Sequence, residues 1–112
     1  MSKAKIRELN DAFRRGDRSD LGRILITSGV RDLCAAWPLG VATVYSIVQR
    51  YDRFTNANDP NNEHDFGTFE FAGAKCFWKL DYYDKKLEYG SEDPADETKT
   101  ARVLTIMLAS EY

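Results

Sequence analysis

Two alternating apolar segments around a glycine constrain the fold of this chain more than any other feature of its sequence. Residues 66–72, FGTFEFA, and residues 75–83, KCFWKLDYY, place apolar side chains at every second position, which is the period of a strand with one buried face. Gly73-Ala74 between them fits a two-residue turn with glycine first. We therefore predict a β-hairpin over residues 66–83.

The two sides of this hairpin differ in character. With Gly73-Ala74 as the turn, one side carries the facing pairs Phe71 and Cys76, Phe69 and Trp78, and Gly67 and Leu80. Because these residues are almost all apolar, we predict that this side faces the core. The other side carries polar and charged residues with two aromatic rings: Thr68, Glu70, Lys75, Phe77, Lys79, Asp81 and Tyr83.

Three further segments have the period of an amphipathic helix. Residues 3–15 repeat apolar side chains every three to four positions, on one helical face. A second helix is predicted from Pro38, whose missing N–H costs nothing at a first helical position, to about Asp52. A third is predicted from Asp93, as N-cap, to about Ser110. This third helix would bury Ala101, Leu104, Met107 and Leu108.

The remaining segments complete a prediction of an α+β fold. Residues 22–29 are rich in β-branched side chains and bounded by glycines, which indicates a strand. Residues 30–37 predict a short helical turn, residues 53–65 a long polar loop, and residues 87–91 a further strand. We expect a small antiparallel sheet of three or four strands, centred on the hairpin, with helices packed mainly on one face.

Length and composition favour one domain over residues 1–112, because 112 residues suffice for one hydrophobic core and not for two. Cys34 and Cys76 do not form a close pair, which argues against a structural zinc site and for a reducing compartment. No stretch approaches the roughly 20 apolar residues of a membrane span. We expect a cytoplasmic protein with no membrane association and, without a nucleotide-binding motif, no cofactor.

The chain resembles a family of small bacterial proteins known as domain of unknown function 3768. The resemblance rests on the strings IRELND, LITSGV, EHDFGTFEF, FWKLDYYD, YGSEDPAD and RVLTIMLASEY. It implies a bacterial protein, often encoded on plasmids or other mobile elements. It assigns no activity and no role to any residue.

Charge is divided unevenly along the chain. Residues 1–50 contain nine Lys and Arg against five Asp and Glu, a net of +4, whereas residues 51–112 contain seven against thirteen, a net of −6. Seven of those acids lie between Asp81 and Glu97. An acidic surface beside aromatic side chains has the composition of an interface for a basic protein partner. The predicted partner-binding residues are Phe77, Tyr83, Asp81, Asp84, Glu88 and Glu92.

These features favour a non-enzymatic protein-binding module. The resemblance implies a mobile genetic element. Our leading hypothesis is therefore that the module inhibits a host nuclease or defence complex. The residue types at the acidic segment support a basic partner, since like charges repel a nucleic-acid backbone.

A second hypothesis is a small hydrolase or nuclease. His64 is the only histidine and is flanked by Glu63 and Asp65, so that a carboxylate could orient the imidazole for acid–base catalysis. The chain has no serine or cysteine in a recognisable nucleophile turn. A structural histidine is the competing interpretation.

The same loop presents oxygen ligands at alternate positions, Asp59, Asn61, Glu63 and Asp65. This spacing is similar to that of a calcium-binding EF-hand loop, but His64 stands where that loop needs glycine. Metal binding is therefore weighed against turns in which these side chains bind the backbone.

A third hypothesis is single-stranded nucleic-acid binding by the outer side of the hairpin. Lys75, Phe77, Lys79 and Tyr83 alternate bases with rings that can stack on nucleobases. Glu70 and the acidic segment oppose it, because they neutralise the lysines and repel phosphates.

Overall fold

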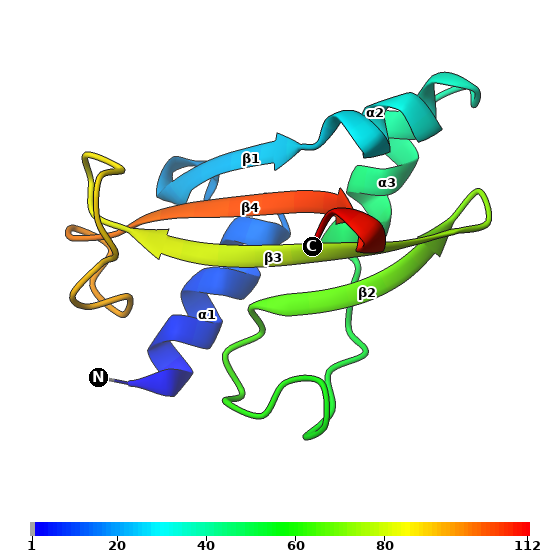
Figure 1. The fold of residues 1–112 in the computed structure, drawn as a ribbon. Helices are drawn as coiled ribbons and strands as arrows, with labels where there is room; N and C mark the ends of the chain where they lie inside the picture. The colour runs from blue at the N-terminus through cyan, green and yellow to red at the C-terminus, as the bar shows by residue number, and fades with distance from the viewer. Residues whose placement is uncertain (1) are drawn as a thin grey trace.

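Four strands form a single sheet in the order β1-β4-β3-β2 (Figure 1). The computed structural model describes residues 2–112. Along the chain the elements are α1 (Lys3–Arg14), η1 (Ser19–Leu21), β1 (Gly22–Ile26), α2 (Ser28–Ala35), α3 (Gly40–Gln49), β2 (Phe66–Phe71), β3 (Ala74–Tyr83), β4 (Ala101–Leu108) and η2 (Ala109–Glu111). The predicted α+β class with a four-stranded sheet is confirmed.

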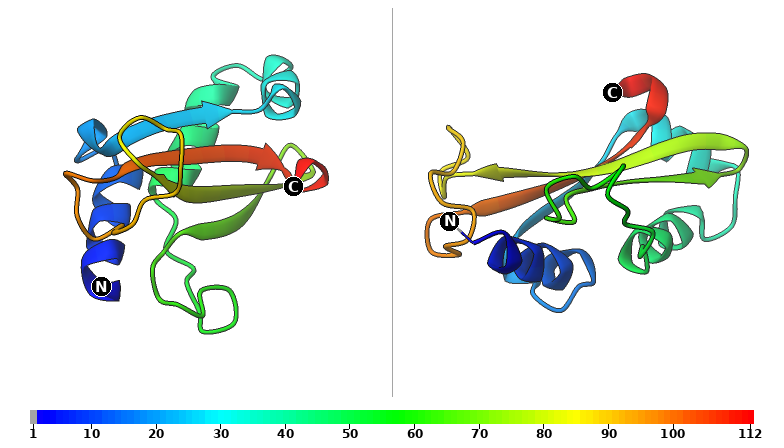
Figure 2. Two further views of the ribbon diagram at one scale, coloured as in Figure 1. Left: turned by 60° about the vertical axis from the view of Figure 1, so that its left-hand side comes forward. Right: turned by 90° about the horizontal axis from the view of Figure 1, so that it is seen from below.

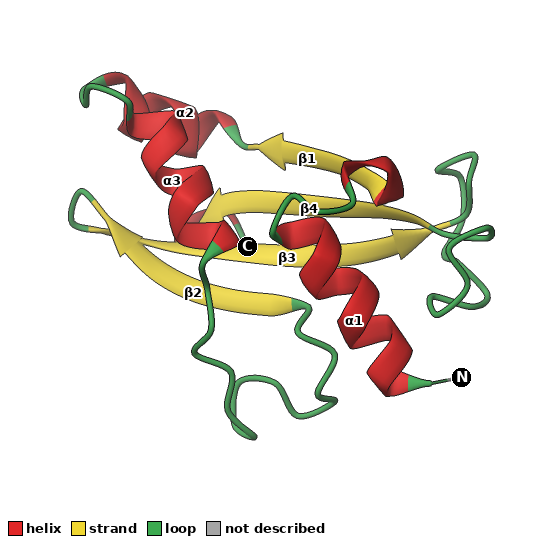
Figure 3. Ribbon diagram, turned by 180° about the vertical axis from the view of Figure 1, so that it is seen from behind, coloured by secondary structure: helices red, strands yellow, loops and turns green. Residues whose placement is uncertain are grey.

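Helices α1 and α3 cover one face of the sheet (Figures 2 and 3), which confirms that the helices pack mainly on one face. Their apolar sides meet the sheet in a core that includes Phe13, Val44, Val48, Trp78 and Leu104. We call the opposite side of the sheet the open face. It carries η2 and the C-terminal residue at one end, and no long helix crosses it (Figure 2).

The hairpin is confirmed, but its turn lies one residue earlier than predicted. Ala72 and Gly73 occupy the turn with φ of 53° and 80°, the conformation of a type I′ turn, which favours glycine second. The register therefore pairs Phe69 with Cys76 and Gly67 with Trp78. This is a slip of two residues, so every side chain keeps its predicted side.

The interior assignment of this strand holds as a result. Cys76 and Trp78 are fully buried and Leu80 is nearly so. Because the pairs shift by two, Glu70 lies opposite Lys75 rather than between the two lysines, and Thr68 lies opposite Phe77.

The predicted C-terminal helix is wrong, because residues 101–108 form the central strand β4. A central strand is buried on both faces and reads as a continuous apolar run, whose positions also fit a helical stripe. Asp93 does not cap a helix; its carboxylate accepts from the N–H of Ala95 in a turn. Strand β4 is antiparallel to β3 and parallel to β1, so the sheet is mixed and not purely antiparallel.

Three local predictions also need correction. Residues 87–91 form no strand; only an isolated bridge joins Gly90 to Tyr83. The helix expected from Pro38 begins at Gly40, after Leu39 adopts a left-handed φ of 56°. The short turn expected over residues 30–37 is part of an eight-residue helix, α2. Within residues 2–112, no helix combines the length and the apolar character that a membrane crossing needs.

Candidate functional site

His64 is held in place by the surrounding structure. Its Nδ1–H donates to the Asp11 carboxylate at 2.9 Å, and its ring stacks on Phe54 with centroids 3.7 Å apart. Its Nε2 lies 3.7 Å from the buried Asp59 carboxylate. Nδ1 and one face of the ring are thus held by neighbours within the chain. This arrangement favours a structural role for the histidine.

Asp59, the first candidate metal ligand of the loop before β2, binds backbone N–H groups of that loop. Asp59 is buried, and its carboxylate accepts from the N–H groups of Glu63 and His64. Asn61 lies exposed on the surface. Among residues 2–112, no group of three or more His, Cys, Asp or Glu side chains is arranged to hold a metal ion. Of the four alternating oxygen ligands, Asp59 organises the turn and Glu63 accepts from the hydroxyl of Tyr82.

The ionisation of Asp65, another candidate carboxyl of this loop, is perturbed by its surroundings. Burial, and then the neighbouring carboxylate of Glu63, raise the pKa of Asp65. The folded chain therefore holds this proton more tightly than the unfolded chain does. Asp65 directly follows His64 in the chain. A carboxyl group with a raised pKa close to a histidine is the feature that supports the hydrolase hypothesis.

A buried polar network lies beside this loop and joins α1 to the sheet. Arg102 Nε donates to Asn10 Oδ1 at 2.7 Å, and Asn10 Nδ2 donates to the hydroxyl of Tyr82 at 2.8 Å. That hydroxyl donates to the Glu63 carboxylate at 3.1 Å. Burial raises the pKa of Tyr82 far above its ordinary value, so the phenol stays protonated and acts as a donor.

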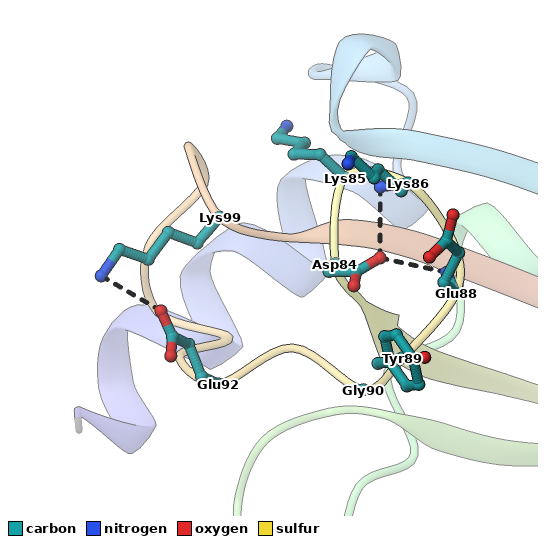
Figure 4. A pocket seen from close by; sticks show the side chains of 8 residues that line it. All are labelled: Asp84, Lys85, Lys86, Glu88, Tyr89, Gly90, Glu92 and Lys99. Atoms are coloured by element: carbon teal, nitrogen blue, oxygen red, sulfur yellow. Dashed lines mark hydrogen bonds and ion pairs between the residues drawn. The ribbon is translucent and has the colours of Figure 1, made fainter.

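The acidic segment, residues 81–97, is mixed in charge in three dimensions. Its loops surround an open hollow of about 540 Å³ (Figure 4). The hollow is lined by three acids, three lysines, a tyrosine and a glycine: Asp84, Glu88, Glu92, Lys85, Lys86, Lys99, Tyr89 and Gly90.

Several of these acids already have partners within the chain. Asp84 accepts from two backbone N–H groups of its own turn. Asp81 pairs with Lys79 at 3.0 Å, and Glu92 lies 3.5 Å from Lys99. The predicted acidic residues therefore lie near one another, but much of their charge is compensated locally.

The two aromatic residues predicted for the interface are only partly exposed to solvent. Phe77 is half-buried on the open face, where Phe66 and Tyr112 pack against it with centroids 5.1 and 5.6 Å away. Tyr83 is also half-buried. The ammonium of Lys75 lies 5.7 Å from the centre of the Phe77 ring. With one lysine over this ring and Lys79 paired to Asp81, the open face offers few free cations for a nucleic acid.

The largest exposed apolar groups lie elsewhere, where the sequence analysis placed no site. Trp37 is 53% exposed and Leu39 is 80% exposed, in the connection between α2 and α3. They line a hollow of about 640 Å³ together with Val41 and Tyr45, and Arg31 stands at its rim. We call this surface the α2–α3 corner. The signal in the sequence was the string Trp-Pro-Leu-Gly, which places two large apolar residues next to a proline and a glycine, the residue types typical of a turn.

Comparison with known proteins assigns the chain to a family. A family model described as protein of unknown function (DUF3768) matches residues 26–111. The chain belongs to this family. Neither the curated proteins nor the solved structures contain a match. In this DUF3768 protein the matched region includes the α2–α3 corner and His64, whereas Asn10 and Asp11, which hold the loop from α1, precede it.

Proposed function

We propose that this DUF3768 protein is a non-enzymatic protein-binding module. The observation that carries the proposal is the exposure of Trp37 and Leu39 around the hollow of the α2–α3 corner. A buried tryptophan or leucine contributes roughly 1.5–3 kcal/mol of transfer free energy relative to an exposed one. Trp37, which packs edge-on against Phe71 but stays half exposed, and the largely exposed Leu39 lie two residues apart beside an arginine, which matches the composition of a binding hot spot.

Backbone strain at the same place supports the proposal. Leu39 has a φ of 56°, a conformation that costs a non-glycine residue roughly 1–2 kcal/mol. The strain holds an apolar side chain outward at the tip of the connection. Backbone strain of this kind concentrates at functional sites.

We extend the proposal to the class of partner that the family resemblance and the charge pattern favour, a basic host protein such as a nuclease or defence complex. The basis is the net charge of −6 in residues 51–112. The local pairing of Asp81, Asp84 and Glu92 reduces the field that this segment can exert, so in this proposal the apolar corner supplies affinity and the acids supply attraction at a distance.

The test compares variants at the two ends of the molecule. A partner captured from a bacterial lysate by the wild-type chain is purified and its affinity is measured by calorimetry. Trp37→Ser is expected to weaken binding at least about 30-fold, the effect of losing a hot spot of about 2 kcal/mol. Tyr89→Ser serves as the control, because it removes a more exposed aromatic ring, 72% against 53%, from the acidic segment without changing its charge. Unchanged affinity in the Trp37 variant would exclude the corner as the interface.

The same measurement decides the role of the acids. Reversing charge at Asp81, Asp84 and Glu88 together is expected to slow association and to make it less sensitive to salt. If the triple variant associates as the wild type does, the acidic segment has no part in recognition.

The hydrolase hypothesis remains a second candidate because His64 lies beside the carboxylates of Asp11 and Asp59. In addition, burial raises the pKa of Asp65, the residue that follows His64 in the chain. His64→Ala is expected to lower the free energy of unfolding in urea by about 1–2 kcal/mol, through loss of the bond to Asp11 and the stacking on Phe54. Asn56→Ala, an exposed change in the same loop, is the control. Turnover of RNA, DNA or esters by the wild type that disappears in the His64 variant would favour the enzyme over the binding module.

A further inference from the structure

The free edge of β1 presents unpaired backbone groups to solvent. The Thr27 N–H donates to the Ile106 carbonyl, and Ile26 is the register partner of Ile106. In a parallel ladder alternate residues bond to the same neighbour, so the peptide groups of Arg23, Leu25 and Thr27 face β4. Those of the intervening residues, Gly22, Ile24 and Ile26, point away from the sheet.

This edge has few of the features that protect edge strands. Proteins usually block an edge with proline, a bulge, several charges or a covering helix. β1 has the sequence GRILI, an unbroken register with β4 and a single charged side chain. The ribbon shows no segment running alongside its outer edge (Figures 1 and 3). Leu25 on the open face is 48% exposed.

We propose that a second copy of this chain adds its β1 antiparallel to this edge, with Ile24 of each copy at the centre of the pair. The Ile24 N–H of each copy then donates to the Ile24 C=O of the other, and Ile26 of one copy exchanges the same two bonds with Gly22 of the other. The two sheets join into one continuous sheet of eight strands around a two-fold axis. This inference goes beyond the proposed function and uses a different surface.

The side chains of β1 are complementary to themselves in this register. On the open face, Arg23 of each copy lies opposite Leu25 of the other copy. No like charges face each other in this register. The aliphatic stem of each arginine covers an exposed leucine. On the core face, Ile24 meets Ile24 and extends the apolar interior. A shift by one residue would place the backbone donors out of line with the acceptors.

Substitutions at Leu25 test this register through charge. Leu25→Lys places two cations opposite two arginines, whereas Leu25→Glu creates two opposite-charge pairs at the same positions. By sedimentation equilibrium, the dimer of the Glu variant is expected to be about 30-fold tighter than that of the Lys variant. Leu25 is exposed, so both variants should unfold at the wild-type temperature. Trp37→Ser should dimerise as the wild type does, which separates this inference from the proposed function.

Amide hydrogen exchange supplies an independent readout. The Ile24 and Ile26 amides should become protected as protein concentration rises through the dimer range, whereas the Arg23 and Leu25 amides should be protected at every concentration. A wild-type chain that stays monomeric at millimolar concentration would overturn the proposal. Equal dimer affinity in the Lys and Glu variants, or exchange at Ile24 and Ile26 that ignores concentration, would overturn it as well.

Discussion

Replacing Arg102 by alanine is expected to lower the free energy of unfolding by about 3–5 kcal/mol, because it removes two buried hydrogen bonds from a charged donor, each worth roughly 1.5–3 kcal/mol. The guanidinium has no contact with solvent, and burial lowers its pKa. It donates to Asn10 Oδ1 and to the Pro94 carbonyl, each at 2.7 Å, and lies 5.3 Å from the Tyr82 ring centre. The alanine variant leaves both acceptors buried without a donor. Urea denaturation followed by circular dichroism measures the loss.

Arg53→Ala is the matched control, because Arg53 is an exposed arginine in the long loop. Its removal should change stability by no more than about 0.5 kcal/mol. A loss below about 1 kcal/mol in the Arg102 variant would mean that the network from α1 to β4 contributes little to the folded state. The lysine variant should remain strongly destabilised, since an ammonium cannot reproduce the planar fork of donors.

Replacing Trp78 by alanine should cost about 3–5 kcal/mol, the typical loss for a large buried aromatic side chain. Trp78 is 0% exposed and meets Tyr51 and Phe54 edge-on, with centroids 5.5 and 6.1 Å apart. Gly67 on the neighbouring strand leaves room for the indole, because a Cβ there would lie 2.3 Å from its Nε1. The cavity left by alanine cannot close without moving β2. Thermal unfolding by calorimetry provides the measurement.

Phe77→Ala is the control for this second variant, since Phe77 is the preceding residue of the same strand and points to the open face. It is half-buried, and we expect its loss to cost less than half as much. Similar losses at the two positions would mean that the helix-covered face is not the principal core.

The hairpin shows how far sequence patterns reach in this chain. Alternation assigned Trp78 and Lys79 to the correct sides, because a side chain's face depends only on the period of the strand. The partner of each residue depends on the turn, and a choice between Gly73-Ala74 and Ala72-Gly73 moved every pair by two positions. The helix at residues 3–14 could be predicted equally well, because its apolar stripe is a pattern of residues close together in the sequence.

The errors arose where long-range packing overrides local pattern. Residues 101–108 are apolar on both sides because they lie between two strands, and this pattern is ambiguous between strand and helix. The bond from Arg102 to Asn10 spans 92 positions, and no local signal predicts it. The exposed Trp37 lies at the end of a segment predicted only as a short helical turn, and the pattern of that segment did not indicate its exposure.

The central place of β4 has a consequence for how the chain acquires its structure. Gly22 pairs with Arg102, 80 positions later, so the first strand has no neighbour in the sheet until residues 101–108 have been made. Until then the nascent chain can form little more than the 66–83 hairpin and isolated helical turns. Such a topology folds late and slowly, and a ribosome-associated chaperone or a protease would meet β1 uncovered throughout that interval.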